Sequence, residues 1–180
     1  MSSKTLLTAG ELEQMPDDDS VQIELDEGEL IAMPPASSDH GDVEWEILLL
    51  LGNYVKKHRL GRLYPGDTGF RLNDGTVRVP DVAFVRGERL REMKGHGFLK
   101  GAPDLAVEIF SPSDSVRQLM RKVKQYFAAG CHTVWIVYPD RREVQILEAA
   151  GADRLLQGDE LLEAPELLPG FSVPVSSLFG

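Results

Sequence analysis

Two carboxylates and a lysine in the middle of the chain are the residues that could do chemistry. Asp81 follows Pro80 at the start of an apolar run, and Glu108 lies inside the apolar segment DLAVEIF (104–110). Carboxylates are rarely buried unless they are paired or bind a metal. Lys122 lies on the helix-like segment after the second run. A metal-dependent phosphodiesterase needs such groups, because the carboxylates hold a divalent cation while cation and lysine stabilise charge on the attacked phosphate.

Each of these residues also has a structural explanation. Asp81 could be an ordinary aspartate at a turn or at the end of a strand, since it follows a proline. Glu108 could form a buried salt bridge with Lys122 or with an arginine. From residue types and spacing alone, both interpretations stay open.

Length and composition predict a single domain over residues 1–180 that is long enough to bury a core. The apolar content of 42% and charged content of 27% are ordinary for a soluble globular protein. Cys131 is the only cysteine, which excludes an intrachain disulfide and favours a cytoplasmic location. The first residues do not resemble a signal peptide, and the longest apolar stretch, at 47–52, is too short to span a membrane.

The net charge of −10 is unevenly distributed along the chain. Residues 1–53 carry 13 acids and 1 base, and residues 143–180 carry 7 acids and 1 base. Residues 54–142 carry 17 bases and 9 acids, a surplus of +8 in the block that contains the three candidate residues. This distribution allows a basic site with acidic flanks, although blocks of sequence need not be surface patches.

The pattern of apolar residues predicts an α+β (α/β-like) fold with a mixed sheet flanked by helices. A capping box at Thr8 predicts a short first helix. A second helix is expected over about 38–59, with Gly61 ending it, and a third over about 114–129. Strands are expected at 21–25, 29–34, 62–65, 69–72, 77–85, 104–110, 133–138 and 143–148.

The strands at 104–110 and 133–138, with the helix between them, predict a β–α–β crossover whose strands are parallel neighbours. Lys122 lies one helical turn before Tyr126, so both share a face that borders the apolar stripe of that helix. A lysine in this position can lay its stem on the sheet and bring its ammonium group to the end of a strand.

Several motifs in order resemble a known family. They are GELIAMPPAS followed by a histidine, VPDVAFV, GAPDLAVEIFSPSD, K-x-x-x-Y and VWIVYPD. Together they closely resemble a large bacterial family of restriction-endonuclease-like proteins, long catalogued as a domain of unknown function, in the PD-(D/E)XK nuclease superfamily. The resemblance covers essentially the whole chain. It implies a restriction-endonuclease-like fold and a nuclease activity.

The resemblance also implies roles for individual residues. Asp81 matches the aspartate of the PD motif, Glu108 matches the acidic residue of the (D/E)XK half-motif, and both would bind Mg²⁺ or Mn²⁺ together with the main-chain carbonyl of Ile109. Typical nucleases have lysine two positions after the acid, where this chain has Phe110. The family's lysine lies on the following helix, which selects Lys122.

The resemblance implies auxiliary roles for the remaining candidates. Glu29 and His40 match positions that recur in the family, and Lys124 is the substitute for Lys122. The expected partner is nucleic acid, most naturally DNA, with Arg117, Arg121 and bases from 56–62 or 71–94 around the site. A catalytically idle nuclease-fold protein that binds nucleic acid, or serves as an oligomeric interaction module, is the alternative. The acidic composition and the missing lysine at position 110 favour it.

A homodimer is also expected. A nuclease that cuts both strands of a duplex usually needs two sites, which a twofold dimer supplies. The apolar segment 167–179 or the hairpin at 21–34 would form the contact, because both lie near chain ends or sheet edges.

Overall fold

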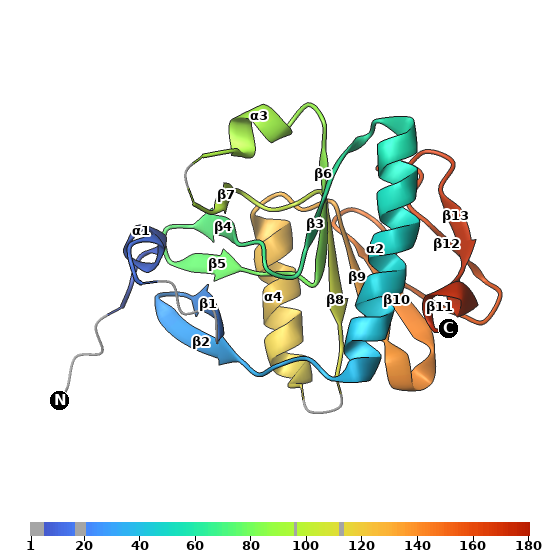
Figure 1. Cartoon of the computed structure of the whole chain (residues 1–180), viewed down its shortest axis with the longest axis horizontal. Helices are drawn as coiled ribbons and strands as arrows, with labels where there is room; N and C mark the ends of the chain where they lie inside the picture. Colours follow the sequence, from blue (N-terminus) through green and yellow to red (C-terminus); the bar gives the residue numbers. More distant parts are fainter. Residues whose placement is uncertain (1–5, 17–20, 96, 112–113) are drawn as a thin grey trace.

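Two mixed sheets and two long helices make up most of the structure, a computed structural model that describes residues 6–16, 21–95, 97–111 and 114–180 (Figure 1). The six-stranded sheet has the order β11-β10-β9-β8-β6-β3, and the five-stranded sheet has the order β2-β1-β5-β4-β7. Strands β12 (Leu161–Glu163) and β13 (Ser172–Pro174) pair separately. The mixed-sheet α+β prediction is confirmed.

The crossover at the centre of the six-stranded sheet follows the predicted order. Strand β8 (Leu105–Ile109) pairs in parallel with β9 (Thr133–Tyr138), and helix α4 (Val116–Ala128) connects them. Side chains alternate across β8, so Val107 packs in the cluster with helix α2 and Ala106 packs in the cluster with α4. Glu108 therefore faces α4, which is the side on which the predicted lysine lies.

Helix α2 (Ser38–His58) covers the other face of β8 and β6, and Ser37 caps its first turn by accepting a hydrogen bond from the His40 N–H. It ends at Arg59, which adopts a left-handed conformation with φ 54°. The prediction that Gly61 ends the helix is wrong. Gly61 opens strand β3 (Gly61–Pro65), where a Cβ would collide with the main chain of Val85.

The expected strand over 77–85 is instead two strands that belong to different sheets. Strand β5 (Thr76–Arg78) lies in the five-stranded sheet and β6 (Val82–Arg86) lies in the six-stranded sheet. Pro80 lies in the bend between them, where it cannot donate to a sheet ladder. The bend places Asp81 at the junction of the two sheets.

The N-terminal hairpin lies at the edge of the five-stranded sheet. Strand β1 (Gln22–Asp26) pairs antiparallel with β2 (Glu29–Met33), as predicted, and Leu25 pairs with Val77 of β5. Helix α1 (Ala9–Glu13) precedes it with the predicted capping box at Thr8. The sheet is completed by β4 (Phe70–Asn73), and by β7 (Leu99–Lys100), which follows α3 (Leu90–Met93).

The C-terminal part packs onto the main core. Strands β10 (Glu143–Glu148) and β11 (Arg154–Gln157) extend the six-stranded sheet, and 3₁₀ turns occupy Pro139–Arg141 and Val175–Leu178. Five apolar side chains of the segment 167–179 are buried in the α2 cluster: Leu167, Leu168, Phe171, Val175 and Leu178. These five side chains are therefore unavailable for a contact between two chains, whereas other residues of the segment are exposed. The expected homodimer stays a prediction.

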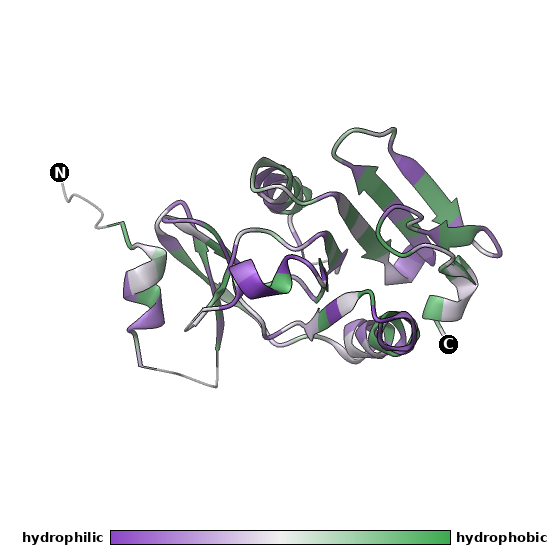
Figure 2. Ribbon diagram, turned by 90° about the horizontal axis from the view of Figure 1, so that it is seen from above, coloured by the Kyte–Doolittle hydropathy of each residue, from purple (hydrophilic) through white to green (hydrophobic). Residues whose placement is uncertain are grey.

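Figure 2 shows that the strands of the six-stranded sheet are largely hydrophobic, while the long helices alternate between polar and apolar faces. This is the pattern of a sheet that is covered on both faces. No helix among residues 6–16, 21–95, 97–111 and 114–180 is both long and apolar enough to cross a membrane.

Candidate active site

The predicted residues meet at a cavity of about 420 Å³ between the two sheets. Its walls come from β1, the segment 34–37 after β2, the first turns of α2, the bend 78–81, the end of β8 and the start of α4. Asp81, Glu108 and Lys122 all line it, and Ile109 does so as well. These residues therefore lie around one cavity, and the roles expected for them stay predictions.

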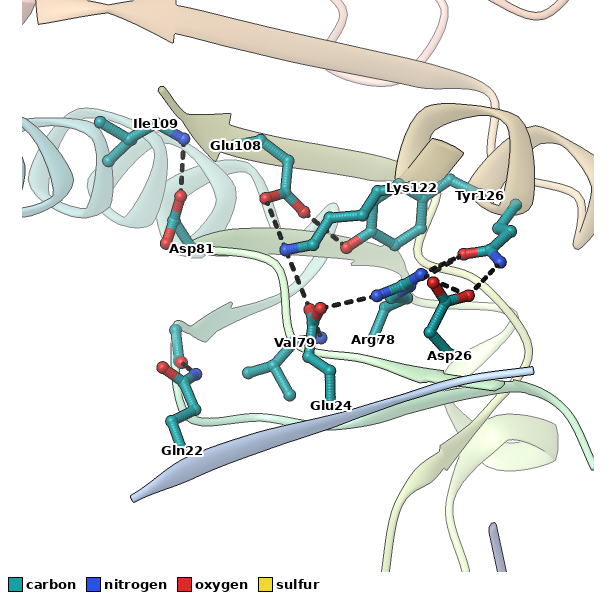
Figure 3. A network of polar contacts seen from close by, with 12 residues as sticks. Gln22, Glu24, Asp26, Arg78, Val79, Asp81, Glu108, Ile109, Lys122 and Tyr126 are labelled. Atoms are coloured by element: carbon teal, nitrogen blue, oxygen red, sulfur yellow. Dashed lines mark hydrogen bonds and ion pairs between the residues drawn. The ribbon is translucent and has the colours of Figure 1, made fainter. Parts of the chain in front are cut away.

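Asp81 is held by groups from two other elements. Its Oδ2 accepts a hydrogen bond from the Ile109 N–H at 2.6 Å, and its Oδ1 lies 3.1 Å from His40 Nε2 (Figure 3 shows the contact with Ile109). Because Val82 pairs with Val107, the carboxylate of Asp81 lies beside the end of β8 that carries Glu108. The hydrogen bond to Asp81 raises the pKa of His40, although burial of the ring opposes this.

Glu108 is a buried carboxylate with two side-chain partners from α4. Only 6% of the residue is exposed; Oε1 accepts from the Tyr126 hydroxyl at 2.7 Å, and Oε2 lies 3.2 Å from Lys122 Nζ. Burial raises the pKa of Glu108 to about 7, and the Asp81 and Glu24 carboxylates add to this while Lys122 opposes it. Neutralising Glu108, or binding a cation beside it, would therefore relieve its repulsion with the Asp81 and Glu24 carboxylates.

Lys122 lies between two carboxylates (Figure 3). Its Nζ is 3.2 Å from Glu108 Oε2 and 3.0 Å from Glu24 Oε1. Burial alone would lower the pKa of this ammonium group, but Glu108 and Glu24 together raise it above its ordinary value. Lys122 therefore stays positively charged at neutral pH. Lys122 lies one helical turn before Tyr126 on α4, as predicted, so both side chains lie on the same face of the helix and reach Glu108.

Glu24 is the site residue that the sequence prediction missed. It is fully buried on β1, and it accepts hydrogen bonds from Arg78 Nη1 at 2.8 Å and from the Val79 N–H at 3.0 Å, besides its contact with Lys122. The available signal was an acid between Ile23 and Leu25 in a predicted strand. Nothing in the sequence indicated that this hairpin lies against the β–α–β crossover.

A further polar network ties the hairpin to α4. Arg78 Nη2 lies 2.9 Å from Asp26 Oδ1, Gln125 donates to the same oxygen at 2.8 Å, and Arg121 Nε lies 3.0 Å from Asp26 Oδ2. Burial alone would raise the pKa of Asp26, but the Gln125 hydrogen bond and the charges of Arg78 and Arg121 lower it. The network fixes the position of β1, and with it Glu24, relative to Lys122.

The predicted auxiliary residues divide into two groups. His40 lines the cavity and contacts Asp81, whereas Glu29 at the start of β2 and Lys124 on α4 are exposed and are not among its lining residues. Arg121 forms ion pairs with Asp26 and with Glu27 at 2.9 Å, which engages it within the chain. Arg117 is exposed on α4 outside the cavity lining.

The cavity lining carries a surplus of negative charge. Seven acids line it (Glu24, Asp26, Glu44, Asp67, Asp81, Glu108 and Asp114), against two permanently charged bases, Arg78 and Lys122, and the histidine His40. The expectation that several bases from 56–62 and 71–94 surround the site is therefore wrong, since of those bases the lining contains only Arg78. Burial, followed by the effect of Asp81 among others, raises the pKa of Glu44, in keeping with this surplus.

The residues present fit a hard divalent cation that is bound from one side. Mg²⁺ commonly uses one or two carboxylates and completes its coordination with water and substrate phosphates. Asp81 and Glu108 are such carboxylates, and the pKa of Glu108 is raised first by burial and further by the Asp81 and Glu24 carboxylates, effects that a bound cation would oppose. Within the described part of the chain, no three His, Cys, Asp or Glu side chains form a ready-made metal site. The protein would thus supply only part of the coordination shell.

The sequence also matches a known protein family over most of its length. Residues 9–176 match the family Uma2, described as "Putative restriction endonuclease". The chain belongs to this family. The match covers nearly all of the chain, and it confirms the family resemblance inferred from the motifs around Asp81 and Glu108.

A solved structure has the same fold. It is described as the crystal structure of a "putative nuclease belonging to DUF820" from Anabaena variabilis ATCC 29413. The two chains are 21% identical, with a TM-score of 0.81, and the alignment covers 96% of this chain and 97% of the other. At this identity the similarity establishes the fold alone. No curated protein matches the chain significantly.

Proposed function

We propose that this Uma2-family protein is a metal-dependent endonuclease that hydrolyses phosphodiester bonds in DNA. The observation that carries the proposal is the pairing of Glu108 with Lys122 in the cavity that also contains Asp81. A carboxylate pair beside a permanently charged ammonium group, on a nuclease-family fold, matches the needs of phosphodiester hydrolysis.

Asp81, Glu108 and the main-chain carbonyl of Ile109 would hold Mg²⁺ or Mn²⁺. When bound, the metal would polarise a phosphoryl oxygen and lower the pKa of a water molecule. The hydrogen bond from the Ile109 N–H keeps the Asp81 carboxylate at the end of β8, beside Glu108. His40 contacts the other oxygen of Asp81, so the carboxylate is oriented from both sides.

Lys122 would stabilise negative charge that develops on the attacked phosphate. Its ammonium group is held by Glu24 and Glu108, and their carboxylates keep it protonated. The Tyr126 hydroxyl donates a hydrogen bond to Glu108 Oε1, and this bond restricts the rotation of the Glu108 carboxylate. Lys122 thus takes the place of the lysine that is absent at position 110, where Phe110 stands.

A nuclease-fold protein that binds nucleic acid without cutting it is the second candidate. One observation favours it: both oxygens of Asp81 and both oxygens of Glu108 already have partners within the chain. A metal would then have to compete with Lys122 for Glu108 and with His40 for Asp81.

Cleavage of supercoiled plasmid DNA tests the proposal directly. The wild type is expected to nick or linearise the plasmid with Mg²⁺ or Mn²⁺ and to stop when a chelator is added. Asp81→Ala and Glu108→Gln should each lower kcat by at least ~100-fold, the size typical for loss of a catalytic group.

Asp104→Asn is the matched control, because Asp104 is a buried, ion-paired carboxylate like Glu108 but lies outside the cavity lining. It should keep kcat at saturating plasmid and at a temperature below its unfolding transition. Cleavage that is unaffected by the metal, by Asp81→Ala or by Glu108→Gln would contradict the assignment. Metal-independent DNA binding without cleavage would favour the second candidate.

A further inference from the structure

Exposed basic side chains gather at the end of the molecule that lies away from the cavity. Across segments 56–62 and 86–94 there are eight lysines and arginines and two acids, Glu88 and Glu92, a surplus of +6 in a chain of net charge −10. Six of the eight are exposed and have no ion pair with any other described residue: Lys56, Lys57, Arg59, Arg62, Arg91 and Lys94. These six residues are called the basic pole.

The two segments of the basic pole are neighbours in space. Gly61 pairs with Arg86 in the β3–β6 ladder, and the Gly87 N–H donates to the Leu60 carbonyl at 3.0 Å. Helix α3 follows directly, and Figure 1 shows α3 and the end of α2 at the same end of the molecule, at the top of the view. Arg86 and Arg89 also lie there, but they share the buried Asp104.

Stabilisation of the helix end explains only part of this cluster. Lys56 and Lys57 lie in the last turn of α2, where positive charge favours the helix dipole. Arg62 lies on β3, and Arg91 and Lys94 lie on and just after α3, so the dipole of α2 does not account for them. Unpaired charges of one sign on adjacent elements form a surface that attracts polyanions.

The basic pole and the cavity lie at opposite ends of the same elements. Helix α2 runs from His40, which lines the cavity, to His58, a rise of about 27 Å over 18 residues at ~1.5 Å each. Strand β6 likewise runs from beside Asp81 to Arg86. At ~3.4 Å per base pair, the length of α2 corresponds to roughly eight base pairs of DNA.

We propose that the basic pole captures nucleic acid through its phosphates, remote from the acidic cavity in which cleavage would take place. The choice of nucleic acid as the polyanion rests on the proposed function, because the same chain carries a nuclease-family site. The exposed bases of the pole would then attract the phosphates of the nucleic acid. The carboxylate-rich cavity would hold only the cation and the one phosphate that is attacked. The inference replaces the sequence-based expectation of bases around Glu108.

Binding of a fluorescent DNA of about 20 base pairs, long enough to reach both regions, tests the inference when measured without metal. Arg62→Glu/Arg91→Glu should weaken binding by at least ~10-fold and lower the slope of log K against log salt by about 1–2. The matched control Arg117→Glu/Lys124→Glu makes the same change in net charge at two exposed bases of α4 and should have a much smaller effect.

The pattern of results separates the inference from the proposed function. If Arg62→Glu/Arg91→Glu raises KM for cleavage while kcat stays constant, the basic pole supplies binding rather than chemistry. If DNA binding depends on the pole but cleavage is absent, the inference holds and the nuclease proposal fails. Equal losses in the two double variants overturn the inference. So does a wild type that binds vesicles of anionic phospholipid but not DNA.

Discussion

Two buried ionic clusters in this molecule differ in their balance of charge. In one, the single carboxylate of Asp104 faces two guanidinium groups, with Arg86 Nε at 2.8 Å and Arg89 Nη1 at 3.0 Å. In the other, Glu24 and Glu108 share the ammonium group of Lys122, Glu24 also pairs with Arg78 Nη1 at 2.8 Å, and the Asp81 carboxylate is nearby. Each cluster contains a buried carboxylate, yet only the second has an excess of carboxylates and opens into a cavity.

The difference teaches how to tell a structural ion pair from a candidate site. A buried carboxylate that is fully compensated by cations and main-chain donors maintains the fold. A buried cluster that keeps uncompensated negative charge weakens the fold unless something else binds there, and such strained sites are frequently functional. The same comparison predicts a larger loss of stability when one charge is removed from the balanced cluster than when one is removed from the other.

The largest expected effect on stability is at the balanced cluster. Asp104→Asn should lower the free energy of unfolding by about 2 kcal/mol, because it removes a buried partner from two arginines that are themselves partly exposed. Asp81→Asn should change it by less than ~1 kcal/mol, since asparagine can still accept from the Ile109 N–H while repulsion with Glu108 falls. Urea denaturation of the metal-free proteins measures both, and equal losses would erase the distinction.

A second prediction concerns pH and the unbalanced cluster. The folded pKa of Glu108 is raised to about 7 from an ordinary 4.5, so its contribution to stability is fully present below pH 4.5 and is lost as pH rises through about 7. Glu108→Gln should remove this part of the decline in stability between pH 4.5 and 7. Denaturation at a series of pH values tests it, and an unchanged slope in the variant would show that Glu108 ionises as an ordinary acid.

The smallest expected effect is a difference in labelling at Cys131. Burial raises the pKa of this thiol to about 12, and the thiol donates to the Thr133 carbonyl at 3.2 Å and lies 3.6 Å from the Asp104 carbonyl. A chromogenic thiol reagent at pH ~8 should therefore react slowly with the native protein. Asp104→Asn should accelerate labelling by a few-fold through local opening, and Asp81→Asn should not. Rapid labelling of the wild type would contradict the buried position.

Most of the fold could be predicted because it depends on local patterns. The apolar runs of β8 and β9, the capping box at Thr8 and the hairpin around Gly28 each carry their own signal. The split of the expected strand at Pro80 could not be foreseen from apolar pattern alone, since Val77 and Val79 before Pro80 and Val82 after it read as one continuous strand pattern. The end of α2 near residue 59 was predicted, but it was assigned to Gly61 instead of Arg59, because a left-handed arginine has no clear sequence signature.

The site was predictable where its residues are neighbours along the chain. Lys122 and Tyr126 share a helix face, and that helix follows the strand of Glu108, so their convergence follows from the crossover. Glu24 was missed, and Arg78 was expected only as one of many bases, because their contacts with Lys122 and Gln125 depend on how the second sheet docks on α4. Such docking is set by long-range packing that single-sequence patterns do not encode.

The most direct test of the central claim, that the excess of carboxylates is a cation site, is a calorimetric titration with Mn²⁺. The wild type should bind one ion per chain, Asp81→Asn and Glu108→Gln should each weaken binding by at least ~10-fold, and Asp104→Asn should bind as the wild type does. Absence of Mn²⁺ binding by the wild type, or equal binding by all four proteins, would contradict the claim.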